Sequence, residues 1–357
     1  MRRNRDTLFK SFLWELLIMA KRAIPAQVSA KPERDYRFDN MKALLIFLVV
    51  FGHLLEPYRQ TGTIIAIAYS VIYIFHIPLF VFISGYFSKN AAKARKNAFA
   101  DLLLPYLIFN TLYGLLFIPF SEVSPFFPEY VYWYLLSLFF WRIMLDSLVK
   151  IRFVLVLSIF VALLCGFLRG FGGILALSRT IVFLPFFLMG YFFDEKMKHR
   201  LAAYPKPIAA AVFAIVCAVA GFASGTQLYL HSLLHTTEKY MPSSFVLSKP
   251  LLLLTAYVLA FVGGISLLRI VPDRPLFFTY FGNSTLPVLL LHPYFIFAVT
   301  KLDQYFTVIS TTLPIVQFGV LAVLAALAVL LLGNRFINKW FSQGLNFLKK
   351  IICKPDS

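Results

Sequence analysis

The sequence predicts an all-α, polytopic integral membrane protein with about ten transmembrane helices. Hydrophobic residues make up 60% of the 357-residue chain and charged residues only 14%, whereas soluble domains have about 45–50% and about 25%. The charged residues lie in short segments between apolar runs that are long enough to cross a bilayer. Lys and Arg are also distributed unequally between alternate segments, as is typical of a membrane protein with a fixed orientation.

Ten apolar runs separated by charged segments are the expected spans. A transmembrane helix needs about 20 mostly apolar residues, and the fourth, fifth and sixth runs fall short of that length. The sequence shows no internal repeat and no soluble domain between the runs. The ten runs are 41–56, 64–87, 99–120, 131–147, 153–168, 179–193, 207–224, 249–268, 278–299 and 313–333.

Three segments follow from this division: an N-terminal segment 1–38, a membrane domain 39–333 and a short basic tail 334–357. The N-terminal segment begins with basic residues, as a signal peptide does, but Lys10 and Glu15 interrupt the apolar stretch that a signal peptide needs. Its apolar residues recur at helical spacing, which predicts an amphipathic helix on the inner membrane surface. Aromatic and basic residues alternate in the tail and predict a second surface-lying helix.

The orientation follows from the positions of Lys and Arg. With the N-terminus inside, 27 of the 34 Lys and Arg residues lie in cytoplasmic segments, six lie outside, and Lys42 lies within the first span. Basic residues near helix ends remain in the cytoplasm, so both termini are expected there, in a bacterial inner or plasma membrane. This distribution accounts for the net charge of +18, and no nucleic-acid partner is expected.

The first span, "DNMKALLIFLVVFGH", carries ionisable groups at both ends: Asp39 and Lys42 at one, and His53 at the other. Eleven residues separate Lys42 from His53, about 16 Å at 1.5 Å per residue. This is close to three turns, so both side chains project from the same side of the helix. Ionisable residues within a membrane face the protein interior and usually mark function. The alternatives are that Lys42 extends to the inner interface and that His53 lies at the outer headgroups.

Two more histidines lie inside expected spans. His76 is near the middle of the second span, two residues before Pro78, and His292 is in the outer half of the ninth, at a depth similar to that of His53. The structural alternative for His76 is a buried ring that is hydrogen-bonded to a backbone carbonyl. No spacing of His, Cys and acidic residues is typical of a metal site, so no metal is expected.

The loop after the second span, "KNAAKARK", is dense in basic residues. Lys93 and Arg95 would suit a phosphorylated ligand, although positive-inside topology and attraction to anionic lipid explain the loop equally well. Further on, Trp133 and Tyr134 are expected at the outer interface, where aromatic belts form.

These segments resemble acyltransferase family 3, a family of membrane-bound acyltransferases, and in particular its fucose 4-O-acetylase-like branch. The resemblance covers about residues 35–333. Much of the family has Arg where this chain has Lys42, and Lys keeps the charge but loses the bidentate geometry of Arg. The segments that carry it, in family order, are "DNMKALLIFLVVFGHLLEPY", "FHIPLFVFISGYFSK", the basic loop running into "LLLPY", "VYWYLL", "FLPFFLMGYFF" and "FGNSTLPVLLLHPYF".

The resemblance implies transfer of an acyl group, most often acetyl, from cytoplasmic acetyl-CoA to a sugar hydroxyl of an envelope glycan or glycolipid. Acetyl-CoA would then be a substrate, and no permanently bound cofactor is expected. On this interpretation His53 acts in catalysis with His76 and Asp39, because an imidazole suits a general base near neutral pH. Lys42, Lys93 and Arg95 would hold the CoA phosphates. The acceptor would contact Trp133, Asn283, Ser284 and His292.

The main alternative is a transporter or flippase for a lipid-linked or anionic solute. Such a protein would use the same intramembrane polar groups and interrupted helices. It is expected to show similarity between its two halves, and the sequence shows none. A purely structural scaffold fits poorly with three histidines inside membrane spans.

Overall fold

The computed structural model describes residues 35–165, 173–226, 230–234 and 248–352, and the expected N-terminal amphipathic helix lies outside these ranges. The described residues form helices and connecting loops, without a β-strand among them. The helices that correspond to the longer runs are α2 (Tyr36–Leu55), α3 (Thr63–Tyr86), α4 (Ala91–Ala98) leading through η3 (Phe99–Leu103) into α5 (Leu104–Phe117), α8 (Leu177–Phe192), α10 (Lys206–Gly225), α12 (Ser248–Ile270), α13 (Thr285–Phe306) and α14 (Pro314–Leu332).

Within the described residues, each of the ten expected runs contains a helix, which confirms an all-α polytopic membrane protein. Eight of the described helical segments are long and apolar enough to cross a membrane. The other two expected spans are α6 (Trp133–Leu148), with 16 residues, and α7 (Val154–Cys165), with 12. At 1.5 Å per residue both helices are shorter than the roughly 30 Å of a hydrocarbon core. These two helices correspond to the fourth and fifth expected runs, which already fall short of a full span in the sequence.

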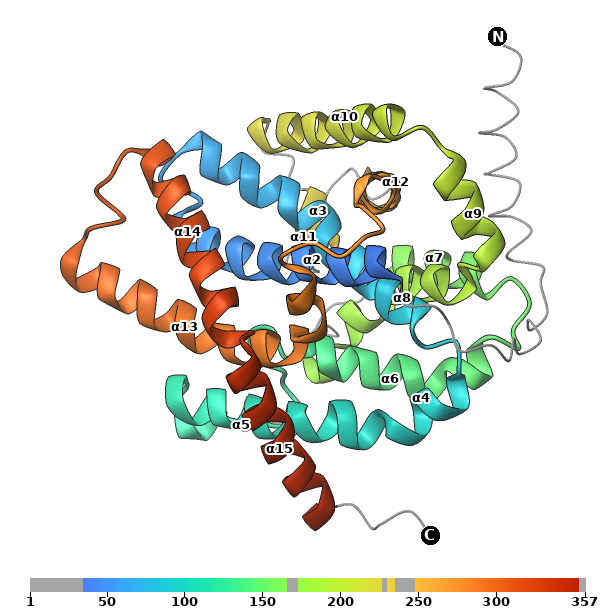
Figure 1. Cartoon of the computed structure of the whole chain (residues 1–357), viewed down its shortest axis with the longest axis horizontal. Helices are drawn as coiled ribbons and strands as arrows, with labels where there is room; N and C mark the ends of the chain where they lie inside the picture. Colours follow the sequence, from blue (N-terminus) through green and yellow to red (C-terminus); the bar gives the residue numbers. More distant parts are fainter. Residues whose placement is uncertain (1–34, 166–172, 227–229, 235–247, 353–357) are drawn as a thin grey trace.

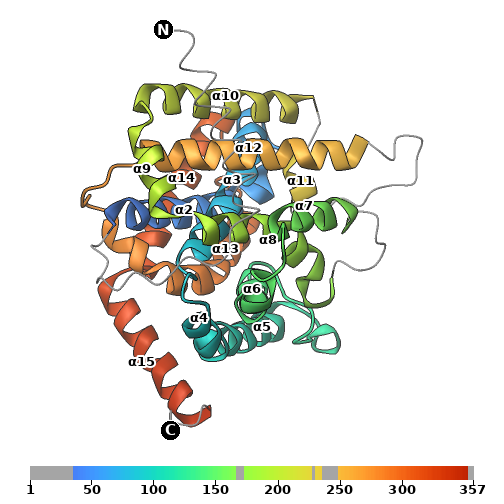
Figure 2. The same cartoon turned by 90° about the vertical axis from the view of Figure 1, so that its right-hand side faces the viewer.

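Helices α2 and α3 form the centre of the molecule (Figure 1). In each, 72% of the most apolar 18-residue window is buried, against 28% in α14. Figure 2 shows α10 and α12 on one side of this centre, and α4, α5 and α6 on the other. The two helices that carry His53 and His76 are therefore shielded by protein, whereas the outer helices expose apolar side chains such as Phe222.

Helix α3 crosses α8 at very short range because glycines face each other there. A Cβ atom on Gly85 would lie 2.0 Å from the carbonyl oxygen of Phe187, and one on Gly190 would lie 1.8 Å from that of Phe82. Small residues permit such close helix contact in membrane proteins. This contact fixes α3 against α8 on the cytoplasmic side of His76, in the orientation that the Lys and Arg distribution predicts.

The tail forms α15 (Arg335–Ile352), which extends away from the helical body (Figure 1). Phe336, Trp340 and Phe347 are exposed on it, as expected for a helix that lies on a membrane surface. Near its end, Lys349 Nζ is 2.5 Å from Asp101 Oδ1 of η3.

Candidate active site

A cavity of about 40 Å³ lies between α2, α3, α6 and α13. Because a water molecule needs at least about 10–15 Å³ of such space, the cavity can hold a few water molecules or the end of a narrow substrate. Its wall is mainly apolar and carries two imidazoles, two phenols and an indole. The lining residues are Val49, His53, Tyr73, His76, Ile77, Phe80, Val131, Trp133, Tyr134 and Leu289.

His53 is held by a carboxylate that the sequence analysis did not single out. Its Nδ1 atom lies 3.3 Å from Oε2 of Glu56 and 3.0 Å from the hydroxyl of Tyr73. A carboxylate only accepts hydrogen bonds, so Nδ1 carries the proton that points to Glu56. The other nitrogen, Nε2, is then a lone-pair acceptor. A carboxylate in this position fixes the tautomer and stabilises the imidazolium that forms when the ring takes up a proton.

His76 and His292 are fully buried and share one arrangement. Nδ1 of His76 donates to the carbonyl of Ile72 at 2.7 Å, and Nδ1 of His292 donates to that of Val288 at 2.9 Å. Because a carbonyl only accepts, each ring presents Nε2 as an acceptor. The hydrogen bond to the Ile72 carbonyl is the one that the structural alternative for His76 predicts. The same ring also lines the cavity.

The ring of His292 lies 5.5 Å from that of His53, which brings together two histidines 239 positions apart in the sequence. The Nε2 atom of His292 is buried and has no hydrogen-bond partner within the described residues. A buried acceptor without a donor is costly, and such groups are retained mostly where a ligand or a reaction uses them. The histidine pair therefore makes this end of the cavity the candidate active site.

Trp133 and Tyr134 lie inside the protein, which corrects the expectation of an aromatic belt. Each is only 6% exposed. The Trp133 ring stacks on Phe183 at 5.3 Å, with the Arg179 guanidinium 5.2 Å from its centroid. The Tyr134 hydroxyl lies 2.6 Å from that of Ser84. The reason is that α6 begins within the helical body, so its first aromatic residues form the cavity wall.

Tyr130 completes the outer side of the site. Its ring centroid lies 4.7 Å from that of His53. Burial and the negative charge of Glu56 raise the pKa of the Tyr130 phenol above its usual value, so the hydroxyl remains protonated and able to donate. The sequence carries no periodic or motif signal for Tyr130, whereas the three-residue spacing from His53 to Glu56 would place both on one helix face.

The remaining predicted site residues of α2 and α13 meet at the opposite end of α2. Lys42 Nζ lies 2.9 Å from Asp39 Oδ1 and 5.1 Å from the centroid of the Phe87 ring. Gly282 packs so closely on the Asp39 backbone that a Cβ there would lie 2.1 Å from the Asp39 carbonyl oxygen. Fourteen residues, about 21 Å along a helix, separate Asp39 from His53. Asp39 therefore neighbours Lys42 rather than the histidines.

Asn283 and Ser284 follow Gly282 and belong to this same end. Asn283 is exposed, and Ser284 is fully buried. They were expected near the acceptor with His292, but eight residues of α13, about 12 Å, separate Ser284 from His292. The structure thus divides the predicted residues of the two helices into a histidine group and a Lys42 group.

Lys93 and Arg95 are exposed on α4, beyond the end of α3. Arg95 Nη1 lies 3.3 Å from Asp146 Oδ2 of α6. Between α3 and α4, Lys89 donates to the carbonyl of Phe193 at 2.7 Å. Burial lowers the pKa of Lys89 below its usual value, with Glu195 opposing the shift. The basic loop is therefore partly tied to neighbouring elements and partly open to a ligand.

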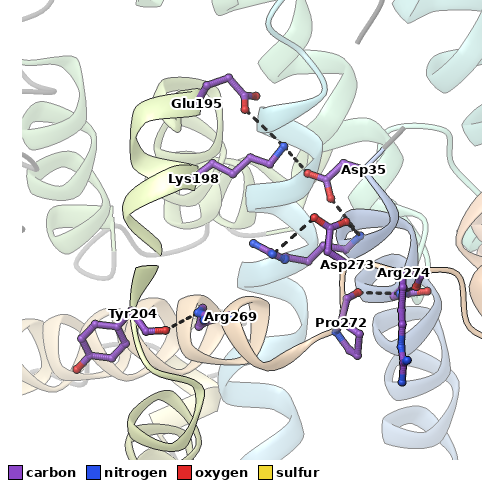
Figure 3. Close-up of polar contacts among 10 residues, drawn as sticks. Asp35, Glu195, Lys198, Tyr204, Arg269, Pro272, Asp273 and Arg274 are labelled. Atoms are coloured by element: carbon purple, nitrogen blue, oxygen red, sulfur yellow. Dashed lines mark hydrogen bonds and ion pairs between the residues drawn. The ribbon is translucent and has the colours of Figure 1, made fainter. Parts of the chain in front are cut away.

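A network of ion pairs fixes the start of α2 (Figure 3). Lys198, on α9 (Glu195–Ala203), lies 2.6 Å from Asp35 and 3.4 Å from Glu195. Burial tends to lower the pKa of Lys198, but the hydrogen bond and charge of Asp35 outweigh this and raise it. Arg37 Nη2 lies 3.6 Å from Asp273 Oδ2. This network joins α2, α9 and the loop after α12.

The buried side chain of Asn40 completes this connection. Its amide group donates to the carbonyls of Pro272 and Arg274, both at 2.9 Å, and its oxygen accepts from the Thr279 hydroxyl. Within the described residues no group of three or more His, Cys, Asp or Glu is arranged to hold a metal ion.

The fold and the cavity define a multi-pass membrane protein with histidines gathered at an internal, partly polar site. The chain belongs to acyltransferase family 3, because the family model described as an acyltransferase domain matches residues 35–333.

The curated relatives share only part of the chain. The Nodulation protein NolL of Sinorhizobium fredii is 39% identical over 88 residues, and that of Mesorhizobium japonicum is 40% identical over 88 residues. Each match covers 22% of this chain and 24% of the relative, so the chain matches about a quarter of their length. No solved structure matches this chain.

Proposed function

We propose that this protein is an O-acyltransferase that moves an acetyl group from acetyl-CoA to a sugar hydroxyl of a cell-envelope glycan or glycolipid. The family supports acyl transfer. The observation that carries the finer proposal is the placement of His53 on the cavity wall, with Glu56 against its Nδ1 atom. A hydroxyl that attacks a thioester needs a base at this kind of position, and His has the appropriate basicity.

The reaction follows from the two nitrogens of His53. Nε2 takes the proton of the acceptor hydroxyl while the hydroxyl oxygen bonds to the thioester carbonyl carbon. Glu56 stabilises the resulting imidazolium through Nδ1. The Tyr134 hydroxyl on the cavity wall is proposed as a donor to the oxyanion, because Ser84 can be the donor in the bond between these two hydroxyls. The carbon–sulfur bond then breaks, and the imidazolium returns its proton to the sulfur. The products are the sugar ester and free CoA.

The donor route is proposed to begin at Lys42. Lys42, Val49 and His53 recur at seven and four residues on α2, which places them along one helix face. Phe87, the residue that follows α3, lies under Lys42, and Ser84, one turn further into α3, bonds Tyr134 of the cavity wall. A narrow acyl-bearing arm along this path would place its thioester at the cavity. The CoA phosphates would remain outside, near Lys42 and the basic α4.

The site is proposed to be reached from both sides of the membrane, with both termini cytoplasmic. Lys42, Lys93 and Arg95 then face the cytoplasm and recruit the anionic donor, while His53 and His292 lie toward the opposite surface. In sealed vesicles of known orientation, acetyl-CoA is expected to work only from the cytoplasmic face and the acceptor only from the other. Equal labelling with both substrates on the cytoplasmic side would instead indicate an enzyme that modifies precursors before export.

The proposed activity is tested most directly by mass spectrometry of envelope glycans from cells with and without the gene. The expected difference is one acyl group on a glycan. Purified protein in liposomes separates this function from transport: an acyltransferase releases free CoA in step with an acylated acceptor. Movement of an anionic solute without any acyl product would overturn the proposal in favour of a transporter.

A further inference from the structure

A row of aromatic rings leads from His53 toward the surface formed by α5 and α13. The Tyr130 ring lies 4.7 Å from that of His53, and the Tyr113 ring is parallel to Tyr130 at 6.0 Å. Phe117 follows at 4.8 Å from Tyr113, and Phe297 at 4.1 Å from Phe117. We call these four side chains the aromatic row. None of them is fully buried, and Phe297 is 36% exposed.

Tyr130 is positioned at a conformational cost. Its φ angle is 43°, a left-handed conformation that is rare and unfavourable for an aromatic residue. The loop that leads to it is anchored by Asn110 of α5, which accepts from the backbone N–H of Glu129 at 2.7 Å. Asn110 also donates to the carbonyls of Ser124 and Phe127. The fold thus maintains a strained residue whose ring covers His53.

We propose that the aromatic row is the acceptor-binding track, and that the acceptor is a glycan extending beyond the sugar that is acylated. This inference rests on the proposed function and deepens it. The C–H face of a sugar ring is apolar with weakly positive hydrogens, and it fits the negative face of an aromatic ring. Tyr130 would hold the reacting sugar at His53, and Phe117 and Phe297 would contact the following sugars.

The position of the row supports a glycan over lipid contact alone. It begins at the histidine site, whose cavity and polar groups are where a hydroxyl must arrive. It ends where Lys301 Nζ lies 5.6 Å from the centroid of the Phe297 ring and 3.1 Å from Gln304 Oε1. An aromatic track with polar groups at both ends is typical of sites that take an amphipathic ligand. Lipid-facing aromatic residues need neither feature.

The test uses purified protein, acetyl-CoA and two sets of probes: a panel of methyl glycosides, and trisaccharides that end in the same sugars. CoA release gives KM for each acceptor. Tyr130→Ala is expected to raise KM at least tenfold for both sets, while Tyr130→Phe, which keeps the ring, changes it less than twofold. Phe117→Ala and Phe297→Ala are expected to raise KM at least five times more for trisaccharides than for methyl glycosides.

Phe120→Ala is the matched control. Phe120 is 83% exposed and lies outside the row in η4 (Phe120–Glu122), so its KM values should equal those of the parent. If Tyr130→Ala does not fold, Tyr113→Leu replaces a ring of the row by an apolar side chain and should raise KM for trisaccharides in the same way. Equal KM values in the parent and the row variants would overturn this inference and leave the proposed function intact. No transfer to any glycoside by the parent would overturn both.

Discussion

The two ends of α2 hold polar groups in different ways. At the N-terminal end, the Asn40 side chain is bonded to two carbonyls and a hydroxyl, so all of its polar atoms have partners. Near it, Arg37 pairs with Asp273 through Nη2, while Nε of Arg37 has no hydrogen-bond partner within the described residues. At the C-terminal end, His53 binds Glu56 through one nitrogen and faces a cavity, and Nε2 of the adjacent His292 has no partner within the described residues. Buried polar groups that are fully satisfied stabilise a fold.

On the proposed function, the contrast between Asn40 and the histidines distinguishes a structural residue from reactive ones without reference to any relative. An imidazole with one nitrogen bonded to a fixed partner and the other nitrogen facing a cavity is oriented but still available to a substrate. Perturbed or incompletely satisfied ionisable groups gather at functional sites for this reason. Substitutions at the two ends should therefore change different quantities: the free energy of unfolding at the N-terminal end, and the rate of acyl transfer at the C-terminal end.

The largest effect is expected from His53→Ala. Loss of a general base lowers kcat by about 10²–10⁴-fold, and this loss is expected in the fraction of the variant that remains folded. The measurement is CoA release by purified protein beside its thermal unfolding midpoint in detergent. Near-normal turnover in a folded His53→Ala variant would exclude His53 as the base, and the same variants of His76 and His292 would then be compared.

Asn40→Leu should produce the opposite result. The substitution leaves the carbonyls of Pro272 and Arg274 and the hydroxyl of Thr279 without their partner, at a cost of about 1–3 kcal/mol for each buried group left unsatisfied. The thermal unfolding midpoint should fall, while kcat per folded molecule remains that of the parent. A large fall in kcat at unchanged stability would show that the two ends of α2 are not separated in function.

Glu56→Gln tests whether the carboxylate orients His53. Gln is nearly isosteric but carries no charge, so it stabilises the imidazolium less. We expect kcat to fall by roughly 10- to 100-fold, part of the 10²–10⁴-fold that proton transfer supplies, with KM for acetyl-CoA nearly unchanged. Glu195→Gln is the control, because Glu195 binds Lys198 and Tyr86 in the network at the other end of α2. Equal kcat values in the two variants would exclude the orienting role.

Hydropathy predicted the helices because apolar length is a property of the chain alone. Within the described residues each of the ten runs contains a helix, and the helices that are too short for a span, α6 and α7, belong to the runs that were short in the sequence. His53, His76 and His292 stood out for a related reason, since an ionisable group in an apolar run is rare whatever its neighbours are.

The partners of these residues were not predictable because partners depend on packing. Hydropathy could not distinguish an interfacial Trp133 from one that lines a cavity, since both settings favour an indole. Asn283 and Ser284 were grouped with His292 because the three lie in one expected span. In the structure Asn283 ends η6 (Thr279–Asn283) and Ser284 caps α13, next to Gly282, which packs tightly on Asp39. Glu56 lies at the end of the first span, where an acidic residue looks like an ordinary interfacial charge.

The smallest effect is expected at the basic loop, which lies outside both ends of α2. Lys93 and Arg95 are exposed, and Arg95 is already paired with Asp146, so water and salt screen their attraction for the CoA phosphates. The double variant Lys93→Gln/Arg95→Gln should raise KM for acetyl-CoA by about threefold to tenfold, with kcat unchanged, and added salt should produce a similar rise in the parent.

The matched control is Lys339→Gln/Lys350→Gln, which removes two exposed positive charges from α15. If both double variants raise KM equally, the net charge of the cytoplasmic surface attracts the donor. If neither does, the loop serves topology alone, and the search for the phosphate site moves to Lys42.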